Sequence, residues 1–315
     1  MNRDELKRLI QGPIATLPTA FDEAFNVDLG VMAELSAWWV ANGLTADRTP
    51  LKVAAAMGEG PDLSDDEWPR VLRTVVDAAG SQAAVVCALK PKNTLHTIED
   101  AKRAQDLGAI GLQIDLPIFH HPTQDDLLRF FADISDAVDI GIMIYNTFWF
   151  GTESMAAETM LRLADAEHVV AIKWAVPEGQ DYDDMRRFAH IFNVIDNSNQ
   201  PIRCHKNGGR GYIDPTTAVY PRHALTVWDL LEAGRYDEVE ALQQSVNNPL
   251  APFRAKTTRR SGGYRQLKGM MAAMGRPVGP PRPPTLPLDE GELAELADIL
   301  AGIGWPVAST PAPVS

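Results

Sequence analysis

The sequence predicts an α/β protein that folds as a (β/α)8 TIM barrel with a C-terminal helical extension. Short apolar runs alternate with amphipathic stretches, which gives about eight strand–helix units over roughly the first 220 residues. Each run is continuously apolar, as is typical of parallel strands that are covered by helices. No GxGxxG motif follows the first run, so a barrel is favoured over an open dinucleotide-binding sheet.

The apolar runs are expected to form the strands of the barrel in chain order. They lie at residues 12–21 (a strand and its exit loop), 51–56, 83–89, 109–116, 140–146, 169–172, 193–197 and 211–214. The amphipathic stretches predict helices at residues 28–43, 63–80, 97–108, 123–138, 153–166 and 181–192. The second of these helices begins with a capping box, because Glu67 follows Ser64 at the required spacing.

After about residue 221 the strand pattern stops and a run of helices is expected. These helices lie at residues 223–234, 236–248, 264–275 and 292–304, and an extended proline-rich arm occupies residues 276–292. We therefore predict a barrel domain at 1–220 and a helical domain at 221–304. Residues 305–315 are expected to be a disordered tail.

Composition excludes several classes of function. The formal charge of −13 and a pI near 5.0 argue against a nucleic-acid partner. Two cysteines that form no CxxC motif fit a reducing compartment, and the charged N-terminal segment does not resemble a signal peptide, so a cytoplasmic location is expected. No apolar run approaches the length of a membrane span, so no membrane partner is expected.

The strand at 169–172 ends in a lysine, Lys173, which is unusual for a run that is expected to be buried. Active sites of such barrels lie at the carboxyl ends of the strands, and a desolvated lysine there has a lowered pKa. A neutral amine can form a Schiff base with a ketone or an aldehyde. The alternative is a lysine that reaches solvent or pairs with a carboxylate such as Glu178.

A tyrosine, Tyr145, ends the preceding strand, and 173 − 145 = 28 residues separate it from the lysine, which is one βα repeat. The two side chains should therefore converge at the mouth of the barrel. A phenol beside an imine-forming amine can transfer protons during imine formation and C–C cleavage. The alternative is a tyrosine that only packs.

Several motifs in order resemble the dihydrodipicolinate synthase / N-acetylneuraminate lyase family of class I aldolases. They are LPTAFDE (17–23), GEGPDLSDDEW (58–68), LPIFHHPTQDDLLRFF (116–131), IYN (144–146), AIKWA (171–175), GGRGYID (208–214) and RPP (282–284). The resemblance implies a homotetramer or dimer that uses a covalent imine at Lys173 and no cofactor, with Tyr145 as the general acid/base. It also implies that Ala56, Met57 and Gly58 bind the carboxylate of a 2-keto acid, and that Asn146 and Ile213 line the substrate pocket.

This sequence departs from the family pattern where the second substrate is chosen. Ala56 and Met57 replace two hydroxyl residues, and Phe119 stands where the synthase has a tyrosine. The segment NTFWFG (146–151) contains no basic residue for the carboxylate of aspartate semialdehyde. Phe148, Trp149 and Phe150, with Met57 and Phe119, therefore predict an apolar or aromatic aldehyde, unless these aromatic residues lie at a subunit interface. Trp174 is expected to add to this aromatic mouth.

Other candidate groups receive narrower roles. His120 is expected in the substrate pocket, and it or His121 could carry protons where the tyrosine is missing. Glu59 is interpreted as a buried acceptor at a helix start, or as an interface residue, rather than a catalytic carboxylate. No HxH or HExxH motif supports a metal site, so a metal-dependent aldolase has no ligand set.

The function predicted from the sequence is a Schiff-base-forming aldolase or lyase that acts on pyruvate or a related 2-keto acid and an aldehyde. A dehydratase or a hydratase-aldolase with the same chemistry stays open. So does a barrel that kept the lysine and lost catalysis.

Overall fold

The computed structural model describes residues 1–117, 121–149 and 153–309. Within them the strands form a closed barrel in the order β1-β2-β3-β4-β5-β6-β7-β8, and every register given between neighbouring strands is parallel. The strands are β1 (Gly12–Thr16), β2 (Leu51–Val53), β3 (Val85–Leu89), β4 (Gly111–Asp115), β5 (Gly141–Tyr145), β6 (Val169–Trp174), β7 (Asn193–Asp196) and β8 (Gly211–Ile213). The predicted (β/α)8 barrel is confirmed.

The helices predicted after β1 to β5 are present, whereas α1, α7 and α8 were not predicted. The α-helices are α1 (Arg3–Leu9), α2 (Leu29–Ala41), α3 (Glu67–Ala79), α4 (Thr94–Asp106), α5 (Gln124–Ala137), α6 (Ala157–Arg162), α7 (Pro201–Lys206), α8 (Thr216–Val219), α9 (Pro221–Glu232), α10 (Tyr236–Thr258), α11 (Tyr264–Ala273) and α12 (Glu290–Gly302). Short 3-10 helices are η1 (Ala56–Gly58), η2 (Gly60–Asp62), η3 (Gly80–Gln82) and η4 (Tyr182–Arg187).

The chain forms two compact units. Unit 1 comprises Met1–Ile14, Leu44–Lys52 and Gly80–Ile213, and unit 2 comprises Ala15–Gly43, Val53–Ala79 and Asp214–Ser315. The helices α9 to α12 of unit 2 are the predicted C-terminal helical extension. The predicted domain boundaries at residues 220 and 304 stay predictions.

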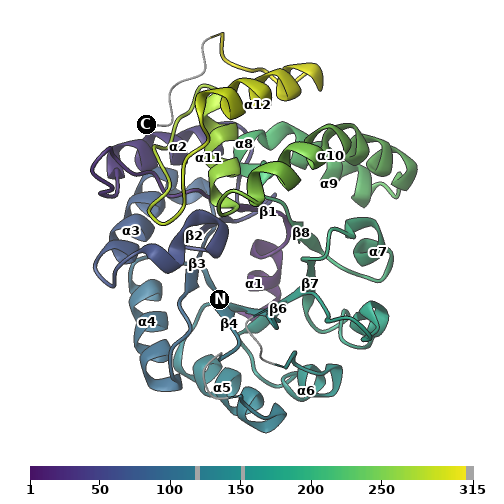
Figure 1. The fold of residues 1–315 in the computed structure, drawn as a ribbon. Coiled ribbons are helices and arrows are strands. Elements are labelled where there is room, and N and C mark those ends of the chain that lie inside the picture. The colour runs from purple at the N-terminus through teal and green to yellow at the C-terminus, as the bar shows by residue number, and fades with distance from the viewer. Residues whose placement is uncertain (118–120, 150–152, 310–315) are drawn as a thin grey trace. The chain divides into compact units, whose positions relative to one another are not determined.

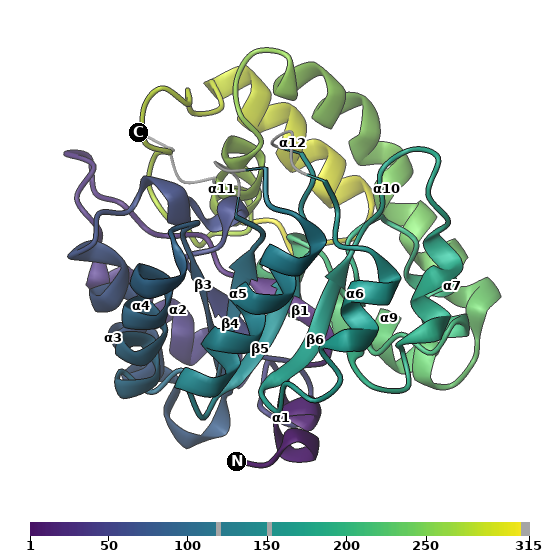
Figure 2. The same ribbon diagram turned by 90° about the horizontal axis from the view of Figure 1, so that it is seen from below.

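In unit 1, helix α1 closes the amino-terminal end of the strands. Figures 1 and 2 show it at that end, where Leu6 and Ile10 join a buried cluster with Val86, Met143 and Ile195. Full burial of such side chains stabilises the fold by about 1.5–3 kcal/mol each. This helix was not predicted from the sequence, although the capping box at Asn2 and Glu5 indicates a helix start.

Three other predicted helices differ in extent from the observed ones. The predicted capping box of α3 is present, since the Ser64 amide donates to Glu67 at 2.8 Å and the Glu67 amide donates to the Ser64 hydroxyl at 3.2 Å. The stretch 181–192 forms only η4, and α6 begins at Ala157 rather than at 153. Helix α10 continues through Pro249 and Pro252 to Thr258, because its buried face outweighs the backbone hydrogen bonds that the two prolines omit. The arm at 276–289 is extended, as its prolines predicted.

Candidate active site

The carboxyl ends of β4, β5 and β6 place three functional side chains in one row. Asp115 is in register with Tyr145, and Tyr145 is in register with Lys173. Neighbours in register on adjacent strands point to the same face of a sheet. The row therefore lies at the end of the barrel where active sites of this fold are built. The predicted convergence of the lysine and the tyrosine is confirmed.

The amine of Lys173 is buried and lies over an aromatic ring. Its side chain is 7% exposed, and Nζ lies 3.4 Å from the centroid of the Tyr145 ring. Burial lowers the pKa of Lys173 to about 8, and the opposing influence of Asp115 is smaller. At pH 7 about one amine in ten is then neutral, against fewer than about one in a thousand for an ordinary lysine. Lys173 is buried, so the predicted alternative of a lysine that reaches solvent does not hold. The carboxylate that acts on its amine is Asp115, whereas Glu178 is exposed.

The hydroxyl of Tyr145 is held by the segment that follows the strand. It accepts a hydrogen bond of 2.8 Å from Nε1 of Trp149 and contacts the side chains of Asn197 and Thr147. Burial raises the pKa of Tyr145, so the phenol keeps its proton. The position of the hydroxyl therefore depends on three side chains, one of them from the loop after β7.

Asn146 lies next to the tyrosine but serves the backbone. Its Nδ2 donates to the carbonyl of Ala175 at 3.1 Å, and its Oδ1 accepts from the amide of Met155 at 2.8 Å. The side chain is fully buried. Asn146 thus ties the loop after β5 to the loop after β6, which fixes the segment that carries Trp149.

A buried polar chain that the sequence analysis did not assign lies beside the row. Lys52 of β2 is 0% exposed and donates from Nζ to Oε1 of Gln113 at 2.9 Å. Nε2 of Gln113 lies 3.5 Å from Oδ1 of Asp115. Burial raises the pKa of Asp115 to about 6, and burial together with Lys173 lowers the pKa of Lys52 well below its ordinary value. The signal in the sequence was a lysine inside the short apolar run LKV.

The residues predicted to bind the 2-keto acid carboxylate form η1 in unit 2. Ala56 is exposed, Met57 is partly exposed and Gly58 is buried. The amide of Gly58 donates to the carbonyl of Ala55 at 2.8 Å, within the turn itself. A Cβ added at Gly58 would lie 2.2 Å from the carbonyl oxygen of Leu17, so this glycine is required for a close backbone approach. The role of η1 in binding stays a prediction.

The remaining predicted pocket residues are only partly described. Ile213 of β8 packs against the apolar cluster of unit 1. The rings of Phe148 and Trp149 contact each other at a tilt of 40° with centroids 4.1 Å apart, and Trp149 is 51% exposed. Phe119, His120 and Phe150 lie outside the described residues, and His121 is exposed.

The side chain of Trp174 points away from that of Lys173, although it lines one hollow together with Phe148, so its place in an aromatic mouth stays a prediction. It is 2% exposed, its Nε1 donates to the carbonyl of Tyr182 at 2.9 Å, and its ring packs on Phe188 at 5.1 Å. The cause is strand periodicity, because consecutive side chains on β6 point to opposite faces and Lys173 takes the inner one.

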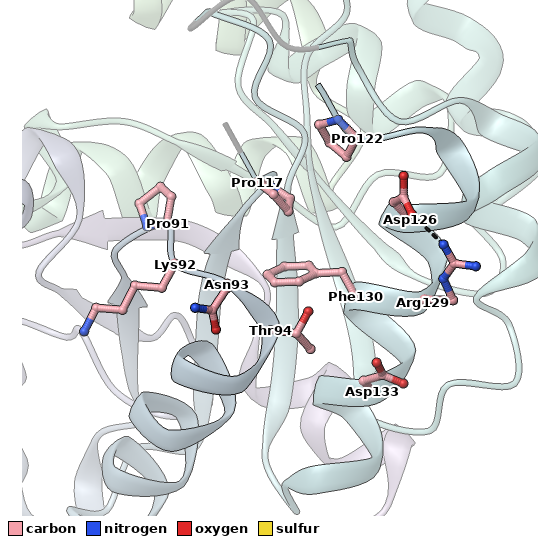
Figure 3. A pocket seen from close by; sticks show the side chains of 10 residues that line it. All are labelled: Pro91, Lys92, Asn93, Thr94, Pro117, Pro122, Asp126, Arg129, Phe130 and Asp133. Carbon is pink, nitrogen blue, oxygen red and sulfur yellow. Dashed lines mark hydrogen bonds and ion pairs between the residues drawn. The ribbon is translucent and has the colours of Figure 1, made fainter. Parts of the chain in front are cut away.

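Two hollows on unit 1 have linings that contain none of Asp115, Tyr145 and Lys173. One has a volume of about 810 Å³ and includes Phe148, Trp174 and Pro177 in its lining. The other, of about 470 Å³, lies between the start of α4 and helix α5, and Figure 3 shows the Phe130 ring pointing into it. Its lining, shown in Figure 3, contains none of the residues of the row.

Glu59 has a structural role in unit 2, as interpreted from the sequence. It adopts φ of 60° and pairs with Lys268 at 2.9 Å, and each side chain is 1% exposed. Its Oε2 also accepts from the amide of Arg282 at 2.9 Å, and Arg282 pairs with Glu67. The carboxylate thereby fastens the proline-rich arm.

Residues 1–117, 121–149 and 153–309 contain no group of three or more His, Cys, Asp or Glu side chains that could hold a metal ion. None of the helices described there is long and apolar enough to span a membrane.

Known proteins resemble this chain over most of its length. The family model described as the dihydrodipicolinate synthetase family matches residues 9–303. The 4-hydroxy-tetrahydrodipicolinate synthase of Acidothermus cellulolyticus is 29% identical over 294 residues, which cover 93% of this chain and 92% of that protein. The corresponding synthase of Kineococcus radiotolerans is 30% identical over 299 residues and 92% of each chain. The crystal structure of dihydrodipicolinate synthase from Aquifex aeolicus has a TM-score of 0.81 at 22% identity, over 95% of this chain and 99% of that chain.

Fold and site together define a (β/α)8-barrel enzyme with a buried amine at the carboxyl ends of its strands. The chain belongs to the dihydrodipicolinate synthetase family. It is a carbon–carbon lyase of the aldolase type, like the relatives that it matches. The resemblance carried by the ordered motifs is confirmed.

Proposed function

We propose that this lyase forms a Schiff base between Lys173 and pyruvate or a related 2-keto acid, and that it needs no cofactor. The observation that carries the proposal is the amine of Lys173, buried 3.4 Å above the ring of Tyr145 at the carboxyl ends of β5 and β6. A fraction of this amine is neutral near pH 7, as attack on a ketone requires.

In this reaction the neutral amine attacks C2 of the keto acid and forms a carbinolamine. The Tyr145 hydroxyl would donate a proton to the departing water; this role is supported by the amine lying over the ring of Tyr145 and by the contacts of the hydroxyl with Trp149, Asn197 and Thr147. The resulting iminium accepts electrons from C3, which allows a C–C bond at C3 to break or to form.

We propose an apolar or aromatic aldehyde as the second substrate. The contact between Phe148 and Trp149 supports it, since Trp149 presents an exposed aromatic face four residues after Tyr145. Residues 146–151 contain no basic side chain that would bind a second carboxylate. Aspartate semialdehyde, the substrate typical of this family, is therefore the less favoured partner.

A dehydratase or hydratase-aldolase would use the same imine and would be recognised by loss or addition of water in a substrate screen. A homo-oligomer, tetramer or dimer, and a cytoplasmic location are implied by the family and stay predictions. Size-exclusion chromatography with light scattering would measure the assembly.

The test is trapping with borohydride. Wild-type protein is incubated with pyruvate, or with one of a panel of other 2-keto acids, and reduced, and peptide mass mapping should place the adduct on Lys173. Lys173→Ala should form no adduct, whereas Lys102→Ala, which changes an exposed lysine on α4, should form it as the wild type does. Activity that survives in Lys173→Ala, or an adduct at another lysine, would contradict the proposal.

The non-catalytic alternative has its own test. A screen with aromatic and aliphatic aldehydes, coupled to pyruvate consumption or release, should reveal turnover in the wild type. Turnover that depends on Lys173 excludes a barrel that retained the lysine without catalysis.

A further inference from the structure

Asp115 places a carboxyl group at a position where the fold needs no polar side chain. It ends β4 between the buried residues Ile114 and Leu116, and its own side chain is only partly exposed. Burying a carboxylate costs free energy unless charges or hydrogen bonds compensate it. A group of this kind at the carboxyl end of a barrel strand indicates chemistry rather than stability.

The groups around Asp115 come from three other strands. On β5 it is in register with Tyr145, and Lys173 of β6 is one strand further, about 10 Å away between Cα atoms. The lysine side chain covers much of that separation, because its Nζ lies over the ring of Tyr145, between the two positions. From β2, Lys52 acts on Asp115 through Gln113. The titratable groups that face the carboxyl are thus Lys173, Lys52 and Tyr145.

Lys52 and Gln113 have a positioning role. The amide of Gln113 can present either its oxygen or its nitrogen to Asp115, and a donor on its other side decides which. Because Nζ of Lys52 donates to Oε1 at 2.9 Å, Nε2 is the end that faces Oδ1 of Asp115. A donor beside the carboxylate favours its ionised form. Lys52 itself is 0% exposed, so it does not contact the substrate and acts on Asp115 only through Gln113 and through its charge.

Tyr145 and Asp115 would have different roles in proton transfer, one as a donor and the other as a base. The hydroxyl of Tyr145 keeps its proton, because burial raises its pKa, and it is therefore a donor rather than a base. The pKa of Asp115 is about 6, so near pH 7 it is largely ionised and can still take up a proton. Proton abstraction from carbon needs such a base.

We propose that Asp115 is the general base that forms the enamine, and the acid that returns the proton. This proposal rests on the proposed function, since it acts on the imine of Lys173. In the direction of synthesis, the Asp115 carboxylate removes a proton from C3 of the pyruvate iminium; the C–H electron pair becomes the C2=C3 double bond, and the C=N pair moves to the nitrogen, which becomes neutral. In the direction of cleavage, the carboxylate takes the proton of the C4 hydroxyl as the C3–C4 bond breaks and the aldehyde forms. The protonated carboxyl then delivers this proton to C3 of the enamine, which restores the iminium and the carboxylate.

The test uses pyruvate alone and requires no second substrate. In D₂O, enamine formation exchanges the methyl hydrogens of pyruvate for deuterium, which ¹H NMR follows, while borohydride trapping measures the imine separately. Asp115→Asn should form the imine but lose methyl exchange by about 10²- to 10⁴-fold. Asp115→Glu should recover part of the exchange. Tyr145→Phe should slow formation of the imine more than exchange from the imine once formed.

A second readout needs no variant at the carboxyl. Methyl exchange in the wild type, divided by the amount of trapped imine, should fall as pH is lowered through about 6, since the base becomes protonated. Lys52→Met should move this fall to higher pH, because it removes a positive neighbour and the group that orients Gln113.

The two proposals fail on different results. A wild-type protein that forms no imine with any 2-keto acid contradicts the proposed function. Imine in both proteins, with exchange as fast in Asp115→Asn as in the wild type, overturns the role of Asp115. The role of Asp115 is also overturned if methyl exchange in the wild type, divided by the amount of trapped imine, is unchanged between pH 5 and pH 7.5.

Discussion

The amine of Lys173 lies 3.4 Å from the centroid of the Tyr145 ring, directly across one strand pair. The ring face and the hydroxyl of the tyrosine therefore have separate functions. The face covers the amine and removes it from water, which lowers the pKa of Lys173. The hydroxyl, which accepts a hydrogen bond from Trp149, is the proposed proton donor. Substitutions can separate the two effects.

Tyr145→Phe keeps the ring and removes the hydroxyl. We expect the rate of imine formation with pyruvate to fall by about 10²- to 10³-fold, because the proton donor for departing water is lost. The pH at which imine formation is half-maximal should stay near 8, because burial of the amine is unchanged. Rapid-quench borohydride trapping measures both quantities. An unchanged rate would show that another group donates the proton.

The pH dependence of imine formation follows from the lowered pKa of Lys173. The neutral amine is the nucleophile, so the rate should rise from pH 6 and level off above about pH 8, more than two units below an ordinary lysine. Asp115 raises this pKa, because its negative charge favours the protonated amine. Asp115→Asn should therefore shift the curve to lower pH.

Asp106→Asn, which changes an exposed carboxylate at the end of α4, is the control and should leave the curve in place. A curve that keeps rising up to pH 10 would mean that burial does not lower the pKa of Lys173. A shift to higher pH in Asp115→Asn would mean that the carboxylate does not act on the amine through its charge.

The sequence predicted the barrel and the pairing of Lys173 with Tyr145 because both follow from local periodicity. Continuous apolar runs define buried strands, and a spacing of 28 residues places equivalent positions on neighbouring strands. Trp174 shows the limit of residue-by-residue reasoning, since strand alternation turns it outward although it adjoins the lysine. The extent of α10 depends on packing that no local pattern contains.

The chain from Lys52 to Asp115 was not predictable from local signals. Lys52 and Gln113 are 61 residues apart and meet only because β2 and β4 both contribute to the interior of the same barrel. The active site was expected at the residues that end each strand, and Asp115 ends β4, but the sequence does not show which side chains lie beside it. The hydrogen bonds of Asn146 to the loops after β5 and after β6 have the same origin.

The ion pair of Lys268 with Glu59 in unit 2 should matter for stability. Nζ of Lys268 also donates to the carbonyls of Thr19 and Pro280, each at 2.9 Å. Lys268→Met leaves a buried carboxylate without its partner, and we expect a loss of about 3–5 kcal/mol in the free energy of unfolding. Lys256→Met, which removes the exposed pair with Glu295, should cost less than about 1 kcal/mol. Urea denaturation measures both, and equal losses would contradict a structural role for the buried pair.

Trp149 offers the sharpest test of an aromatic second substrate, because its two contributions can be removed one at a time. Trp149→Phe keeps an aromatic ring near Phe148 but loses the N–H that donates to Tyr145, so it should slow all aldehydes alike. Trp149→Ala removes the aromatic ring as well. For this variant we expect the ratio of kcat/KM for an aromatic over an aliphatic aldehyde to fall by about a further 2- to 10-fold, the value of one aromatic contact. Steady-state kinetics with matched aldehydes measure the ratio, and an identical ratio in both variants would place the aromatic pair outside the binding site of the aldehyde.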